Sequence, residues 1–171
     1  MNYRSALILT LALLANPMTV QAAQSQMIKQ SRDWTAFMAE EDGNKVCYMV
    51  SRPKSERGDY SKRGKTFTIV THRPAERSFD VISVIAGYEY KPGSTVKVQV
   101  GSRTHTLFTH NDTAWARDSR SDRDLADAIR SGAKMVIKGT SSRGTATTDT
   151  YGLSGSGDAY EAMSRACGVR R

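Results

Sequence analysis

The sequence is dominated by short segments in which apolar and polar residues alternate, the spacing of β-strands that bury one face. The clearest example is 95–100, which carries valine at every second position and leads through a Gly101-Ser102 turn into 103–108. This pattern predicts a mainly β protein. The expected strands are 34–39, 46–50, 66–71, 79–85, 95–100, 103–108, 114–116, 134–138 and 145–151.

Two segments instead have the apolar spacing of a helix, three or four residues apart. The first is expected to begin at Ser121, whose distance from Asp124 resembles a capping box, and to end at Gly132. The second is expected from near Gly157-Asp158 to Gly168. We therefore expect a single-domain antiparallel β-sandwich or partly open barrel with two short peripheral helices.

The first residues have the pattern of a secretory signal. Arg4 supplies a positive charge, 6–15 is an apolar core, and Val20-Gln21-Ala22 fits the small-x-small cleavage pattern. The apolar core is about half as long as the roughly 20 residues of a membrane-spanning helix, so we expect a cleaved leader rather than an anchor. Residues 1–22 are the expected signal peptide. Residues 23–171 are the expected β-rich domain, in the periplasm, on the outer surface or secreted.

Cys47 and Cys167 are the only two cysteines of the chain. Export delivers them to an oxidising compartment, where cysteine pairs persist as disulfides. Redox catalysis usually needs closely spaced thiols such as C-x-x-C, and the chain has none. We therefore expect a structural disulfide between the strand at 46–50 and the C-terminal helix.

The chain is basic, with a formal net charge of +8 that becomes +7 when the leader is removed. Positive charge gathers in 52–65, a polar loop with Tyr60 in its middle and Glu56 and Asp59 as its acidic residues. Such a loop can attract an anionic ligand, and a solvated loop without a ligand is the alternative. The candidate ligand-binding residues are Arg52, Lys54, Arg57, Lys62, Arg63 and Lys65.

The sequence shows no recognisable catalytic or metal-binding pattern. His72, His105 and His110 lack the spacing of metal ligands, and no serine lies in a G-x-S-x-G or S-x-x-K motif. We therefore expect no metal, no cofactor and no catalytic residue. A hydrolase with an unfamiliar site is the alternative, and it would need the fold to join Ser141, Ser142 and His105.

Large aromatic side chains at alternate strand positions are expected to point into the core. Tyr88-Glu89-Tyr90 follows a strand end and is a candidate exposed contact. The expected core aromatics are Trp34, Phe67, Phe79, Phe108 and Trp115.

Short motifs follow one another along the chain: Asp33-Trp34, Val46-Cys47-Tyr48, Arg63-Gly64, Ala86-Gly87-Tyr88, Ala114-Trp115, 139–145, 149–155 and Ala166-Cys167. In this order and spacing, over roughly residues 33–168, they resemble the invasion-associated locus B proteins of alphaproteobacteria. The resemblance implies a periplasmic or surface-associated β-rich domain that some pathogens use to invade host cells, including erythrocytes. It implies no agreed catalytic residues. Many members have further cysteines near the first strand, where this chain has Phe37 and Ala39.

These observations predict a non-enzymatic exported envelope protein that contributes to host-cell interaction or invasion through a binding surface. The expected partner is an envelope or host-surface protein, a glycan or an anionic lipid. Nucleic acid is not expected, because export removes the chain from the cytoplasm and aromatic residues are too sparse for base stacking. A structural protein that maintains the envelope is the alternative, and a hydrolase is a further one.

Overall fold

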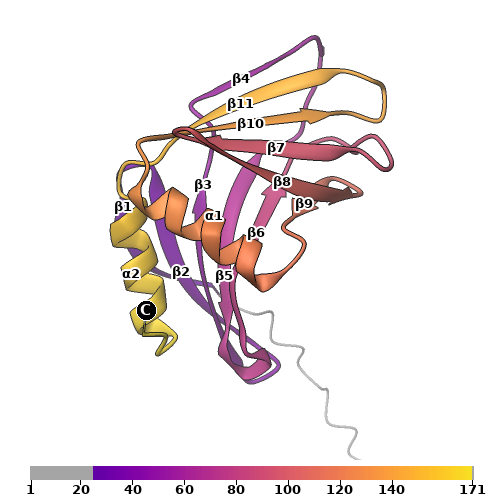
Figure 1. Cartoon of the computed structure of the whole chain (residues 1–171). Coiled ribbons are helices and arrows are strands. Elements are labelled where there is room, and N and C mark those ends of the chain that lie inside the picture. Colours follow the sequence, from indigo (N-terminus) through magenta and orange to yellow (C-terminus); the bar gives the residue numbers. More distant parts are fainter. Residues whose placement is uncertain (1–24, 171) are drawn as a thin grey trace, which may run out of the picture.

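The computed structural model describes residues 25–170, and the expected leader at 1–22 lies outside them. The described strands form one antiparallel sheet in the order β1-β2-β3-β5-β6-β9-β8-β7-β10-β11-β4. The sheet is strongly curved and not closed (Figure 1). The predicted mainly β architecture with two helices is confirmed. The strands are β1 Gln26–Ser31, β2 Trp34–Glu41, β3 Asn44–Ser51, β4 Ser55–Gly58, β5 Phe67–Arg73, β6 Ser78–Ile85, β7 Thr95–Val100, β8 Arg103–His110, β9 Thr113–Trp115, β10 Lys134–Thr140 and β11 Ala146–Gly152.

All nine expected strands are present, and the two edge strands β1 and β4 were not expected. Strand β1 pairs with β2 and β4 pairs with β11, and both have almost only exposed side chains. An edge strand that buries no face has no reason to alternate apolar and polar residues. Strand β1 also contains a bulge between Met27 and Lys29. Periodicity therefore identifies the strands that build the core and misses the edge strands that bury no face.

Helices α1 (Ser119–Ser131) and α2 (Ser156–Ala166) pack against the sheet, and their buried apolar residues join its core (Figure 1). The expected cap of α1 at Ser121 is wrong. The carboxylate of Asp118 instead accepts a hydrogen bond from the amide of Ser121, at 2.7 Å, and starts the helix earlier. Asp118 has extended backbone, as a capping residue requires. None of the described helices is long and apolar enough to cross a membrane.

The core lies between the inward face of the sheet and the two helices. Trp34 is fully buried, and its indole nitrogen donates to the carbonyl of Gly152 at 3.1 Å. Phe108 and Trp115 are opposite one another in register on the outer face, because the neighbouring Leu107 and Ala114 take the buried positions. Phe108 is 40% exposed and Trp115 is only partly buried, so the prediction that these two side chains lie in the core is wrong.

Residues 52–54 connect β3 to β4, and this short connection draws the two halves of the sheet together. Strand β3 pairs with β5, whereas β4 pairs with β11 far along the sheet order. The backbone amide of Lys54 donates to the carbonyl of Thr150 at 2.7 Å, and the backbone amide of Asp33 donates to the carbonyl of Ser154 at 3.2 Å. The loops that follow β4 are thereby placed beside the end of β11.

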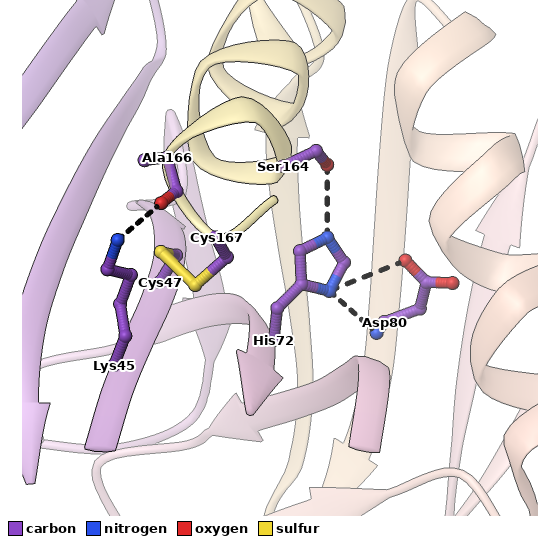
Figure 2. Close-up of a disulfide and its surroundings, with 7 residues drawn as sticks. All are labelled: Lys45, Cys47, His72, Asp80, Ser164, Ala166 and Cys167. Carbon is purple, nitrogen blue, oxygen red and sulfur yellow. Dashed lines mark hydrogen bonds and ion pairs between the residues drawn. A yellow bond between two sulfur atoms is a disulfide. The ribbon is translucent and has the colours of Figure 1, made fainter. Parts of the chain in front are cut away.

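The predicted disulfide is confirmed between Cys47 of β3 and Cys167, the residue after α2 (Figure 2). Beside it, the ammonium group of Lys45 donates to the carbonyl of Ala166 at 3.1 Å. The bond therefore fastens the C-terminal helix to an early strand, across a separation of 120 residues.

Replacing both cysteines, in Cys47→Ala/Cys167→Ala, is expected to lower the free energy of unfolding by roughly 2–5 kcal/mol. The physical reason is that the cross-link restricts the unfolded chain across a long loop. Urea unfolding followed by tryptophan fluorescence measures the loss. Wild type in reductant is the control and should show the same loss, whereas the variant should not respond to reductant. A variant with the wild-type urea midpoint would contradict the prediction.

Candidate functional site

A pocket of about 570 Å³ opens where three loop segments meet at one end of β10 and β11. The segments are 59–64, 87–89 and 141–147. Its wall combines tyrosine rings, hydroxyl groups and charged side chains, a composition that can fix the orientation of a small polar ligand. The lining includes the side chains of Tyr60, Lys62, Arg63, Tyr88, Ser142 and Arg143.

Arg63 forms the base of this pocket and is held by a buried carboxylate. Its two terminal nitrogens donate to the two oxygens of Asp149 at 2.6 and 2.7 Å, and its Nε donates to the carbonyl of Ala86 at 2.7 Å. The side chains of Arg63 and Asp149 are 3% and 4% exposed. Bidentate pairs of this kind are strong and geometrically specific. The pair therefore fixes the 59–64 loop against β11.

Two tyrosines complete the surroundings of the guanidinium group. Its carbon lies 5.6 Å from the centre of the Tyr60 ring and 4.9 Å from that of Tyr88, both within cation–π range. The hydroxyl of Tyr88 is hydrogen-bonded to that of Thr147 at 2.5 Å. Tyr88 also packs edge-to-face on Tyr90, which is buried. Of the Tyr88-Glu89-Tyr90 tip, only Glu89 is therefore fully exposed.

A contact between two glycines allows the loop to approach this closely. The amide of Gly64 donates to the carbonyl of Gly87 at 2.9 Å. A Cβ atom on Gly87 would lie 2.5 Å from the carbonyl oxygen of Gly64, and Gly87 has a φ of +72°. Both the space and the backbone conformation therefore require glycine at this position.

The resolved pKa shifts at the pocket keep their groups protonated. Burial raises the pKa of Tyr88 and that of Tyr90. Burial by itself lowers the pKa of Arg63, but the hydrogen bonds and charge of Asp149 outweigh it, so the pKa is raised. These three groups are therefore protonated at neutral pH, and none of them offers a base.

The six basic residues singled out in the 52–65 loop divide between different places. Lys62 lines the pocket, while Arg52 and Lys65 line an adjoining hollow that shares Arg63 with it. Lys62, Arg52 and Lys65 are exposed, whereas Arg63 points inward and its charge is balanced by Asp149. The positive charge available to a ligand here is therefore carried by the exposed residues.

The other two basic residues lie apart from the pocket. Lys54 forms an ion pair with Asp33 at 2.5 Å. Arg57 is exposed on β4, opposite Thr148 of β11 in register. Arg57 therefore belongs to the outer face of the sheet.

The structure does not join the residues of the hydrolase alternative. Ser141 and Ser142 line the pocket, and the hydroxyl of Ser141 accepts a hydrogen bond from the amide of Thr145 at 3.1 Å. Nε2 of His105, on β8, is buried and makes no hydrogen bond within residues 25–170. Burial lowers the pKa of His105, which favours the neutral ring. His105 therefore does not serve either serine as a base in this arrangement.

A second serine–histidine–aspartate grouping, which the sequence did not suggest, lies beside the disulfide (Figure 2). Nε2 of His72 is 3.0 Å from the hydroxyl oxygen of Ser164, and Nδ1 is 3.8 Å from a carboxylate oxygen of Asp80. Tyr160 donates to the same oxygen of Asp80 at 2.6 Å. All four side chains are buried, and the contacts bring α2 together with β5 and β6.

The hydrogen bonds of this grouping run opposite to those of a catalytic triad. In a triad, Nδ1–H donates to the aspartate and Nε2 accepts the serine proton. Here the amide of Asp80 donates to Nδ1 of His72 at 3.1 Å, so the proton of a neutral ring lies on Nε2. Nε2 then donates to the oxygen of Ser164. The grouping therefore fastens α2 to the sheet, and in this tautomer His72 does not activate the serine.

Replacing Asp149, in Asp149→Asn, is expected to destabilise the fold by about 3–5 kcal/mol, because the buried guanidinium group of Arg63 loses its carboxylate. Urea unfolding measures the loss. Arg63→Met/Asp149→Leu is expected to recover most of it, since an apolar pair leaves no buried charge. The control is Glu41→Gln, which breaks the half-exposed ion pair with Arg73 and should cost about 1 kcal/mol or less. An Asp149→Asn variant as stable as this control would contradict the prediction.

Several motifs that carry the family resemblance meet at the pocket, namely Arg63-Gly64, Ala86-Gly87-Tyr88, 139–145 and Asp149. A family model described as "Invasion associated locus B (IalB) protein" matches residues 34–164, which is most of the chain. No curated protein and no solved structure shows significant similarity to the chain. The chain belongs to the invasion associated locus B family.

Proposed function

We propose that this chain is an exported, non-enzymatic binding protein that contributes to host-cell interaction through the pocket beside Arg63. The observation that carries the proposal is the preorganised wall of the pocket, fixed by the buried pair of Arg63 with Asp149. A rigid site loses less conformational entropy when a ligand binds. Family membership supports the link to invasion, and the secretory pattern at 1–22 supports export.

We propose the acidic end group of a surface glycan as the ligand, bound directly by the cations of the pocket, which the exposed carboxylates of Asp59 and Glu89 also line. Tyr60 offers an amphipathic ring against which a sugar can pack. Ser142 and Thr145 offer hydroxyl groups, and Lys62 and Arg143 offer exposed positive charge to a carboxylate. Arg63 acts as a positioning residue, because its donors already serve Asp149 and the backbone.

Titration of the isotope-labelled domain with glucuronic acid, observed by NMR, tests the ligand class. Saturable shifts are expected at the amides of Gly64, Gly87 and Ser142, and glucose should cause none. Lys62→Gln/Arg143→Gln should weaken binding about tenfold, the loss of roughly 1.4 kcal/mol in two charge contacts.

Lys29→Gln/Arg165→Gln is the matched control, because it removes two exposed positive charges elsewhere and should leave the affinity unchanged. Equal weakening in both double variants would contradict a specific site, as would the absence of shifts at the three amides.

Beads coated with wild type or Lys62→Gln/Arg143→Gln then test host contact, and only the wild type should adhere to host cells.

The non-enzymatic part of the proposal has its own test. A fluorophosphonate probe labels serines that a neighbouring base activates. We expect no labelling of the folded wild type, because His72 donates to Ser164 and Ser141 lacks a histidine partner in the described part of the chain. Labelling that disappears in Ser164→Ala or Ser141→Ala would overturn this part.

A further inference from the structure

The outer face of β4, β11, β10 and β7 presents positive charge without negative charge. Its strands contain two acidic residues, Glu56 and Asp149, which are opposite one another in register. Both face the guanidinium group of Arg63, at 4.0 and 2.6 Å, and so belong to the inner side. The residues that alternate with them point outward, and none of these in the four strands is acidic.

The register places three cations of this face in one row that crosses the strands. Arg57 is opposite Thr148, Thr148 is opposite Lys138, and Lys138 is opposite Lys97. Lys97 in turn is opposite Thr106 of β8, to whose hydroxyl its ammonium group donates at 2.8 Å. Since neighbouring strands are about 5 Å apart, the row forms a narrow band of positive charge. We call the residues Arg57, Lys138 and Lys97 the cationic row.

The direct pairing of Lys97 with Lys138 is unfavourable for folding, because like charges opposite one another in a sheet repel. Both side chains are exposed, and neither forms an ion pair with an acidic side chain in the described part of the molecule. A surface that gathers charge at a cost to stability is suited to a ligand of the opposite charge. The cationic row has the form of a binding band for a linear anion.

We propose that the cationic row binds an extended anionic polysaccharide laid across the strands. The adjacent row of the outer face supplies hydroxyl and amide groups for hydrogen bonds with sugars, from Ser55, Thr150, Gln99 and Thr104. Val136 is the apolar residue between them. A membrane surface fits less well, since binding in the interface also requires apolar side chains that insert. This band is separate from the pocket, whose base lies on the inner side of β11.

Binding to immobilised heparin, used as the anionic polysaccharide, tests the proposal at about 0.15 M ionic strength. Wild type is expected to bind heparin and not dextran, an uncharged polysaccharide. Lys97→Gln/Lys138→Gln should bind heparin about tenfold more weakly. Lys97→Arg/Lys138→Arg should bind like wild type, because the charge is kept. The melting temperature of the glutamine variant should not fall, because a repulsive pair is removed.

Arg120→Gln/Arg123→Gln is the matched control, because it removes two exposed charges from α1 and should retain wild-type affinity for heparin. Equal weakening in the two glutamine variants would overturn the proposal, since net charge alone would then explain binding. Binding to phosphatidylglycerol vesicles without binding to heparin would also overturn it, in favour of a membrane surface. Lys62→Gln/Arg143→Gln separates the two sites, because it should weaken binding of glucuronic acid and leave heparin binding to the row unchanged.

Discussion

The buried ion pair between Arg63 and Asp149 is the interaction on which the candidate site depends. Both side chains are buried, so each charge depends on the other for its stability. The bidentate geometry of the pair fixes the 59–64 loop against β11. The contact of Gly64 with Gly87 then brings a second loop to the same place. The pocket is thus formed by three segments that are distant in sequence and are joined by the Arg63–Asp149 pair and the Gly64–Gly87 hydrogen bond.

A second set of polar contacts has a comparable role at the C-terminal helix. The disulfide, the hydrogen bond from His72 to Ser164 and that from Tyr160 to Asp80 all connect α2 with the sheet. Similar residue types can make a catalytic site, and the position of one proton distinguishes the two cases. The donor to Nδ1 of His72 is a backbone amide, which in the neutral ring puts the proton on Nε2, the reverse of the arrangement in a triad.

The alternation of apolar residues predicted the core strands, and the compartment of an exported chain predicted the disulfide. Strands β1 and β4 were not predicted, because they bury no face and so lack the apolar alternation. Arg63 was assigned to an exposed patch because a loop rich in lysine and arginine is usually solvated. One signal was present: Asp149 alternates with Thr147 and Tyr151, which both point inward, and an inward carboxylate needs a cationic partner. The sequence offers no means of choosing that partner among many basic residues.

The bulge in β1 bears on how copies of the molecule meet. A sheet that is not closed leaves backbone donors and acceptors along its outermost strand, and a flat strand of this kind invites another chain to pair with it. The irregularity between Met27 and Lys29 interrupts that template, and the charge of Lys29 opposes close approach. At its β1 edge, the open sheet therefore offers a neighbouring copy an interrupted row of backbone donors and acceptors, rather than the flat strand that favours edge-to-edge pairing.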